Sequence, residues 1–351
     1  MKHRLKMFLR ESVARLVYHT PLWRLCDLLA PRRLLVLAGH CVEAPSNAFL
    51  APEMKIREET LEELLSWLQR RFQATRVAEG WAQLQGSSGK SLFALSMDDG
   101  YRDNLTHLLP LTERLDVPVT IYLESRPLEG EKVNWMHKFF WLLERMEVTK
   151  IGHRYGELTK IERDDILTNQ IVAAGIDVVY LWKKMLKYDV DPLERDRVMD
   201  LIYVEAGGEE AALCADLYLD KDGARSLAKA GWELGGHTVS HHSVSTLDED
   251  AQRREIIGGR EALISELGAG CESFAYPFGR RWDFDETSVS LAREAGFECA
   301  VTTHAGVNTK ASDAYRLNRW MIDDSVKLHL VAAEMCGAFL LLRKLGLDLS
   351  E

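Results

Sequence analysis

Residues 91–100 read Ser-Leu-Phe-Ala-Leu-Ser-Met-Asp-Asp-Gly, an apolar run that ends in two carboxylates. A short, continuous apolar run bounded by a turn signal is typical of a strand that is buried on both faces. A helix is expected over 104–115 and another strand over 118–122, which is the spacing of parallel β/α units. Active residues of such folds gather at the carboxyl ends of the strands. Asp98 and Asp99 fall at such an end.

A second motif, His-Thr-Val-Ser-His at residues 237–241, follows another expected strand over 233–236. Two histidines four positions apart share a face in a helical turn, so both imidazoles can reach one ion. One carboxylate and two neutral imidazoles suit zinc or a similar divalent ion and leave a coordination position open. Alone, each motif is also compatible with a plain turn or a helical surface pair. Together they favour a metal site with a second carboxylate free to act as a base, which is the equipment for metal-assisted hydrolysis.

With these two motifs the chain resembles the polysaccharide deacetylases of the NodB-homology type, also called carbohydrate esterase family 4. The resemblance covers residues 34–325 and is supported by Phe-Ala-Tyr-Pro-Phe-Gly at 274–279 and by a late segment at 300–306. It implies an α/β fold, a distorted (β/α) barrel, which here carries a large helical insertion over about 127–225. It also implies a hydrolase that uses metal-activated water to remove an N-acetyl, or O-acetyl, group from a carbohydrate.

The resemblance also implies roles for particular residues. Asp98 would be the general base, and the backbone N–H of Phe278 would help to stabilise the oxyanion. The divalent ion, most simply zinc, would be held by Asp99, His237 and His241.

Two departures from the family pattern leave roles open. Many members have an arginine beside the base in the third motif, and this chain has Ala275 there, so the cation is expected from Arg319 or Arg316, with Arg319 preferred. The family's late Leu-x-His is out of register here, and His304 is the candidate general acid. Three aromatic residues could form a sugar platform or belong to the core: Tyr276, Trp282 and Trp320.

Composition narrows the class of substrate and partner. The chain has 351 residues, is 46% hydrophobic and carries a net charge of −10, which argues against nucleic acid as a partner. Its six cysteines are scattered, as is typical of reduced, mostly buried thiols. No secretory signal or membrane span is apparent, so a cytoplasmic location is expected. The expected substrate is an acetylated glycan, or a nucleotide- or lipid-linked sugar made at the inner membrane face.

Three segments outside the barrel strands have a helical period. Residues 1–33 are amphipathic and basic, and either pack on the domain or lie on an anionic membrane face, which would make the protein peripheral to the inner membrane face. The insertion over 127–225 is expected to contact substrate as a lid or wall, or merely to cap the barrel. Residues 326–351 are expected to form a C-terminal helix.

Two other functions remain open from the sequence. The same scaffold could hydrolyse another C–N bond, such as that of a formamido sugar or a cyclic amide. The chain could also be a non-catalytic carbohydrate-binding module, although a binding module has no chemical need of two carboxylates and two imidazoles together.

Overall fold

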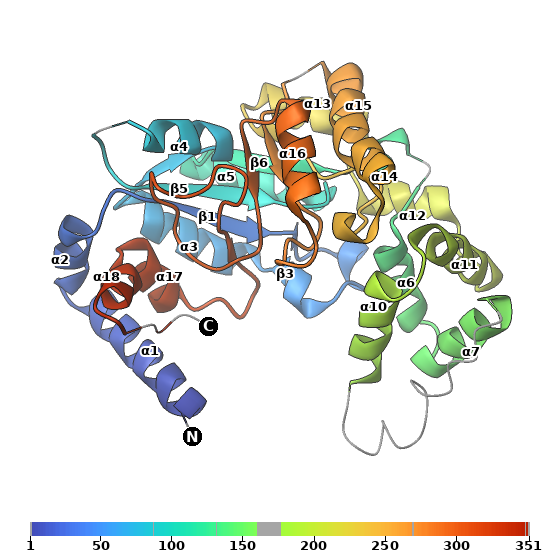
Figure 1. Cartoon of the computed structure of the whole chain (residues 1–351), viewed down its shortest axis with the longest axis horizontal. Helices are drawn as coiled ribbons and strands as arrows, with labels where there is room; N and C mark the ends of the chain where they lie inside the picture. Colours follow the sequence, from blue (N-terminus) through green and yellow to red (C-terminus); the bar gives the residue numbers. More distant parts are fainter. Residues whose placement is uncertain are drawn as a thin grey trace.

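The computed structural model describes residues 2–86, 88–130, 132–159, 177–268, 270–347 and 349. Its core is a curled sheet of parallel strands that forms a half-barrel surrounded by helices (Figure 1). The predicted (β/α) barrel architecture is therefore confirmed. In order across the sheet the strands are β10 (Trp320–Met321), β1 (Leu34–Gly39), β5 (Leu92–Met97), β6 (Val119–Leu123), β7 (Glu233–Gly236), β8 (Ser273–Ala275) and β9 (Cys299–Val301), and β4 (Gln73–Thr75) also pairs with β5.

The two longest strands are buried on both faces, as their continuous apolar sequences predict. Every residue of β1 and β5 is buried, and the two strands pair in parallel from Leu34–Leu92 to Gly39–Met97. A parallel sheet covered by helices has no solvent face, so its strands need no alternation of polar and apolar residues. This register also brings the carboxyl ends of neighbouring strands to one edge.

The helices that follow the strands pack on the outside of the sheet. Helix α3 (Glu58–Gln69) buries the apolar positions expected from its spacing, among them Leu61, Leu65 and Leu68. The other covering helices are α4 (Val77–Leu84), α5 (Leu109–Leu115), α13 (Lys221–Lys229), α14 (Glu249–Arg253), α15 (Gly259–Leu267) and α16 (Glu286–Ala295).

The predicted insertion forms a helical body on the right of Figure 1, and its apolar core continues onto barrel residues such as Cys41 and Leu50. Large side chains such as Phe139, Trp182 and Met199 are buried within it. Residues 160–176 of the predicted insertion lie outside the described residues. Its described helices are α6 (Trp135–Leu143), α7 (Val148–Thr159), α10 (Val178–Tyr188), α11 (Pro192–Glu205) and α12 (Glu210–Leu217).

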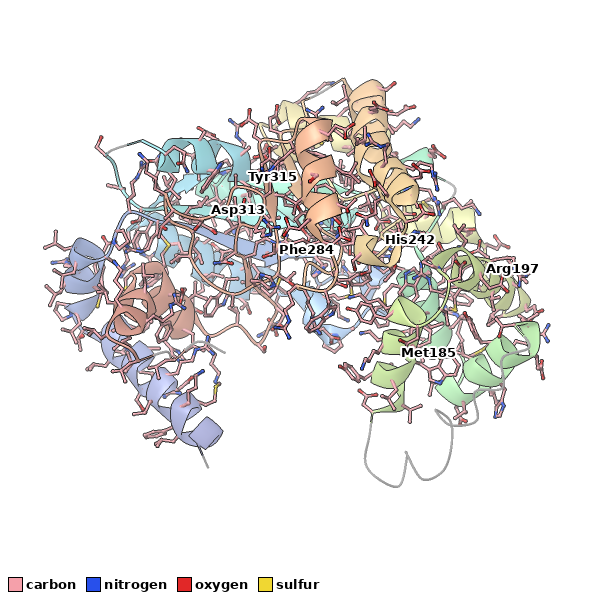
Figure 2. The ribbon with its side chains drawn as sticks, viewed as in Figure 1. Met185, Arg197, His242, Phe284, Asp313 and Tyr315 are labelled. Carbon is pink, nitrogen blue, oxygen red and sulfur yellow. The ribbon has the colours of Figure 1, made fainter. Side chains whose placement is uncertain are left out.

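A polar contact ties this body to the barrel close to the histidine motif. Nε2 of His242 lies 2.9 Å from Oδ2 of Asp196 in α11. Figure 2 shows His242 between the insertion, which holds Met185 and Arg197, and the barrel. The insertion is thus attached beside the candidate site.

The two chain ends pack on each other at the opposite side of the sheet (Figure 1). Helix α1 (Lys2–His19) lies against α17 (Leu328–Met335), next to α2 (Leu22–Leu29) and α18 (Ala338–Lys344). The prediction of one C-terminal helix is wrong, because Gly337 separates α17 from α18 with a φ of +83°. A Cβ atom on Gly337 would lie 2.4 Å from that of Ala30, so this close approach requires glycine.

Two further expectations concern membrane spans and cysteines. Among the described residues, no helix has both the length and the apolar character needed to cross a membrane. All six cysteines are free thiols, and every one except Cys26 is buried.

Candidate metal and active site

The sheet brings the two sequence motifs to one edge. Strands β5, β6 and β7 are neighbours, and each motif continues the hydrogen bonding of its strand. The backbone N–H of Asp98 donates to the carbonyl of Gly39 at 2.9 Å, and that of His237 donates to the carbonyl of Leu123 at 2.9 Å. Both motifs therefore lie just beyond the carboxyl ends of the strands, where parallel folds place their sites.

Three of the predicted residues form one buried cluster. Oδ1 of Asp99 lies 3.3 Å from Nε2 of His237 and 3.3 Å from Nε2 of His241. The three candidate ligand atoms all lie within 4.8 Å of one another. Oδ1 of Asp99 is buried without a hydrogen-bond partner among the described residues. A buried, unpaired carboxylate oxygen is costly, and a cation facing it and two imidazole nitrogens would remove that cost.

Backbone contacts orient the first imidazole. Nδ1 of His237 lies 2.7 Å from the carbonyl oxygen of Ala275 and donates to it, so the lone pair of Nε2 faces Asp99. Burial lowers the pKa of His237, but the two aspartates more than offset this and the net shift is upward. Burial holds the pKa of His241 well below its usual value, which favours the neutral form that binds metal. Ala275 thus contributes to the site through its backbone carbonyl.

The turns that carry these side chains have unusual backbone conformations. Among the described residues, five that are not glycine have positive φ, and four of them lie at the site: Asp99 (69°), Thr238 (68°), His241 (56°) and Phe278 (62°). Thr238 is β-branched, so this conformation is especially unfavourable for it. Such conformations persist only where the surroundings enforce them, and they concentrate at functional sites.

Glu255 stabilises the backbone of the turn that carries His237 and His241. Its Oε2 accepts hydrogen bonds from the backbone N–H groups of Val239 at 3.0 Å and Ser240 at 2.9 Å. Its Oε1 accepts from the Ser240 hydroxyl at 2.5 Å. Glu255 lies in the helical turn η6 (Arg254–Gly258), and the sequence analysis missed it.

Asp98 forms a buried, bidentate ion pair with Arg319. The two guanidinium nitrogens lie 2.7 and 2.8 Å from its two oxygens, and Nε of Arg319 donates to the carbonyl of Thr302 at 2.8 Å. Burial alone would raise the pKa of Asp98, but Arg319, together with the nearby imidazoles of His237 and His40, more than offsets this and the pKa is lowered. Arg316 instead pairs at the surface with Asp313. The cation beside Asp98 is therefore Arg319.

Of the two remaining predicted catalytic residues, Phe278 contacts the cluster and His304 does not. The ring of Phe278 contacts that of His241 edge to face, with centroids 4.7 Å apart. The His304 side chain is exposed, and its ring lies 6.4 Å from that of Phe284. The cluster does not include His304, whose role as the general acid stays a prediction.

A buried lysine from the insertion reaches the edge of the site and was not singled out by sequence. Nζ of Lys187, in α10, lies 3.3 Å from the ring centroid of Phe278 and 3.1 Å from Oδ1 of Asp283. Burial lowers its pKa to about 7, although Asp283 opposes the shift. The insertion therefore brings a titratable amine beside the residue predicted to stabilise the oxyanion.

The three candidate platform aromatics separate clearly. Tyr276 is buried and stacks on Phe284, with centroids 4.2 Å apart. The guanidinium of Arg10 lies over the ring of Trp320, with Cζ of Arg10 5.6 Å from the ring centroid. Trp282 is 48% exposed, and its Nε1 donates to the Tyr188 hydroxyl at 2.7 Å. Of the three, Trp282 is the one with a ring open to a sugar.

Comparisons with known proteins agree with this fold. The family model described as polysaccharide deacetylase matches residues 196–300. No curated protein sequence shows significant similarity to the chain. The Streptococcus pyogenes deacetylase PplD, solved in complex with acetate, is similar in structure with a TM-score of 0.56 and 15% identity, over 87% of this chain and 99% of that one.

Two more solved structures share the fold. IcaB from Ammonifex degensii gives a TM-score of 0.53 at 16% identity, over 87% of this chain and 97% of that one. A de-N-acetylase from Aggregatibacter actinomycetemcomitans gives 0.54 at 13% identity, over 85% and 98%. The matched family segment contains both histidines of the cluster, so the chain is similar to polysaccharide deacetylases over residues 196–300. The solved deacetylases share its fold.

Proposed function

We propose that this protein is a metal-dependent hydrolase that removes an N-acetyl, or O-acetyl, group from a carbohydrate. The observation that carries the proposal is the buried cluster of Asp99, His237 and His241 beside the Asp98–Arg319 pair. The cluster offers a cation one carboxylate oxygen and two imidazole nitrogens. The neighbouring carboxylate is kept ionised and is not part of the cluster. A binding module would need neither feature.

The ligand set suits zinc, which when bound would lower the pKa of a water and polarise the acyl carbonyl. Asp98 takes the proton of the attacking water, and Arg319 fixes both of its oxygens so that the carboxylate cannot rotate away. The backbone N–H of Phe278 donates to the oxyanion. The C–N bond then breaks, acetate leaves, and the amine takes a proton from His304 as predicted, or from Lys187, which the insertion brings to the site edge.

The test is release of acetate from N-acetylated oligosaccharides and from nucleotide- and lipid-linked N-acetyl sugars, followed by proton NMR. Chelation should stop release, and added zinc or cobalt should restore it. Formate release from formamido sugars, without acetate release, would favour the alternative hydrolysis of another C–N bond. No product together with no bound metal would favour the binding module.

Trp282 is proposed to stack on a sugar ring of the substrate. Changing Trp282→Ala should raise KM by about 3- to 10-fold and leave kcat nearly unchanged, since the lost ring would bury apolar area against the sugar equally in the ground and transition states. Steady-state kinetics on an acetylated oligosaccharide measure both constants. Trp320→Phe is the matched control, because Trp320 packs against Arg10. Equal KM values for wild type and Trp282→Ala would remove Trp282 from the substrate site.

We further propose that α1 and α2 rest on an anionic membrane surface, as a peripheral contact of a cytoplasmic protein. Residues 1–33 hold eight Lys and Arg against two acidic residues, although the whole chain has a net charge of −10. Helix α1 buries Ala14 and Val17, yet large apolar side chains are exposed on its other face and along α2. We call these the N-terminal apolar face: Leu5, Phe8, Leu9, Leu16, Leu22, Leu25, Leu28 and Leu29.

An anionic lipid surface matches both the exposed apolar side chains and the positive charge of this face. Arg15 and Arg24 are exposed beside it. Basic amphipathic helices bind such surfaces by burying apolar side chains at the headgroup boundary while their cations meet anionic lipids. The contact would bring the protein to lipid-linked sugars of the inner face.

Cosedimentation with vesicles tests the membrane contact. Wild type should bind vesicles with phosphatidylglycerol, more weakly at high salt, and the double change Phe8→Ser/Leu28→Ser should weaken binding by at least about 10-fold. Leu193→Ser, at an exposed site on the insertion, is the control and should bind as wild type does. Wild type that stays unbound would contradict the proposal, and a dimer lost in the double variant would assign the face to a second copy of the chain.

A further inference from the structure

Three side chains lie buried beside Asp99 and join it to both ends of the helical insertion. Tyr101 follows the Asp98–Gly100 turn, His137 lies in α6 near the start of the insertion, and Tyr218 follows α12 at its end. All three are at most 3% exposed. Tyr101 and Tyr218 form an antiparallel bridge, and their rings stack with centroids 6.0 Å apart.

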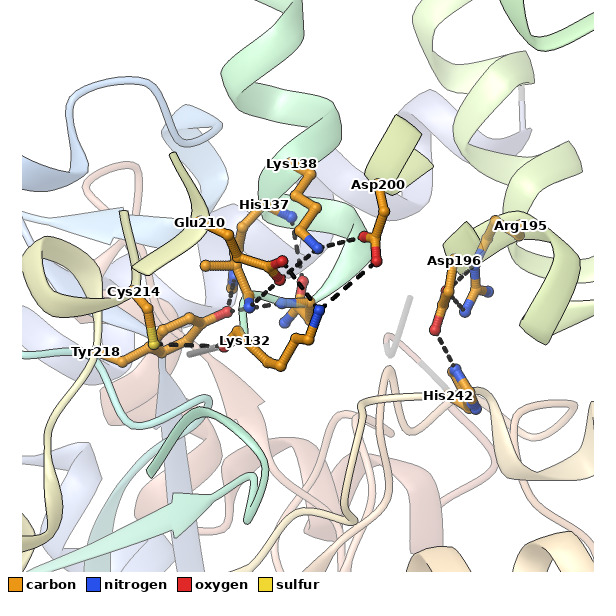
Figure 3. Close-up of polar contacts among 12 residues, drawn as sticks. Lys132, His137, Lys138, Arg195, Asp196, Asp200, Glu210, Cys214, Tyr218 and His242 are labelled. Carbon is orange, nitrogen blue, oxygen red and sulfur yellow. Dashed lines mark hydrogen bonds and ion pairs between the residues drawn. The ribbon is translucent and has the colours of Figure 1, made fainter. Parts of the chain in front are cut away.

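The polar atoms of these residues form one continuous chain of hydrogen bonds. The Tyr101 hydroxyl lies 3.0 Å from Oδ2 of Asp99 and also contacts Nε2 of His137. Nδ1 of His137 contacts the Tyr218 hydroxyl, a contact drawn in Figure 3. The backbone N–H of Asn134 donates to that hydroxyl oxygen at 3.4 Å.

The Asp99 end of this chain fixes the direction of its first two hydrogen bonds. The carboxylate can only accept, so the Tyr101 hydroxyl donates to it and must itself accept from Nε2–H of His137. In a neutral imidazole Nδ1 is then the acceptor, so the Tyr218 hydroxyl donates to Nδ1 and accepts from the Asn134 N–H. Burial lowers the pKa of His137 to about 4, consistent with that form.

The chain of hydrogen bonds also gives the two Asp99 oxygens different partners. Oδ2 is occupied by Tyr101, whereas Oδ1 has no hydrogen-bond partner among the described residues and faces the two imidazoles. A donor fixed to Oδ2 holds the carboxylate so that one oxygen alone points to the cation.

We infer that Tyr101, His137 and Tyr218 are positioning residues through which the helical insertion fixes the metal ligand Asp99 and so sets metal affinity. The inference rests on the proposed metal-dependent function. It gives the insertion a task besides capping the barrel or contacting substrate. Outer partners of metal ligands typically change metal affinity by about 10- to 100-fold when removed.

The test is metal affinity in the full-length protein, measured for zinc and cobalt by competition with a chromogenic chelator. Tyr101→Phe keeps the ring and removes the donor to Asp99, and should weaken affinity by about 10- to 100-fold. Tyr218→Phe should cause a smaller loss, because Tyr101 still reaches Asp99 while the His137 tautomer is no longer fixed. Tyr203→Phe, at a buried tyrosine in the same apolar core, is the matched control and should bind metal as wild type does.

Two further readouts separate positioning from general damage. The visible spectrum of the cobalt protein should change in Tyr101→Phe and not in Tyr203→Phe, and the thermal midpoints of the metal-free variants should be similar. Tyr101→Phe with an affinity within twofold of wild type would overturn the inference but leave the proposed function intact. If Tyr101→Phe does not fold, unchanged affinity in Tyr218→Phe overturns it instead. Wild type that binds no metal would overturn the proposed function itself.

Discussion

Replacing His237 and His241 together by alanine is expected to abolish metal binding and catalysis. Both Nε2 atoms face Oδ1 of Asp99 at 3.3 Å, so the double change leaves the carboxylate as the sole ligand of the cluster. One oxygen ligand does not retain a divalent ion against water, and the hydrolysis then loses its activated nucleophile. We expect metal content to fall from about one ion per chain to near zero, and acetate release to fall by at least about 10³-fold.

Elemental mass spectrometry and NMR of acetate release measure these two losses. The matched control is His107→Ala/His153→Ala, which removes two imidazoles outside the cluster and should keep both metal and activity. Circular dichroism shows whether the variants are folded. A double variant at the cluster that still held one ion per chain would mean that the ion binds elsewhere.

Asp98→Asn is expected to lower kcat by about 10²- to 10⁴-fold, the usual contribution of a positioned general base. The amide keeps the shape of the side chain and an oxygen that accepts from Arg319, but it cannot take a proton from water. Metal content should stay at the wild-type value, because Asp98 lies outside the ligand cluster. Acetate release under saturating substrate gives kcat, and elemental analysis gives the metal.

The change also leaves Arg319 as a buried, unpaired charge, which costs about 3–5 kcal/mol of folding free energy. The double variant Asp98→Asn/Arg319→Gln removes that charge and should recover stability but not activity. Asp116→Asn is a control at an exposed turn with a φ of +52°, which asparagine tolerates. Near-normal turnover of Asp98→Asn with metal bound would show that another group is the base.

The sequence was most informative where a pattern is local. Continuous apolar runs identified the buried strands β1 and β5, because a parallel sheet covered on both faces tolerates few polar side chains. The carboxylates and histidines at strand ends were recognised because parallel strands end at a common edge. A single C-terminal helix was expected wrongly, because the contact between Gly337 and Ala30 joins residues from opposite ends of the chain.

Features built from distant residues were not predictable in this way. Contacts of His137 with Tyr101 and Tyr218 span 36 and 81 positions, and no spacing rule connects them. Glu255 holds a turn 15 and 16 positions before it, across a helix whose orientation depends on packing. The left-handed conformations of Thr238 and Phe278 contradict local preference and exist because their surroundings enforce them.

The sequence by itself determined the strand framework, the family resemblance and the set of residues that could hold a metal. Each of these depends on residue type and short spacing, which physical chemistry links to strands, turns and ligands. Tertiary structure decided that Arg319 rather than Arg316 pairs with Asp98, and that the insertion reaches Asp99 through Tyr101. These outcomes depend on which side chains are brought within a few ångströms in a buried space, where an unpaired charge or polar atom is too costly to remain.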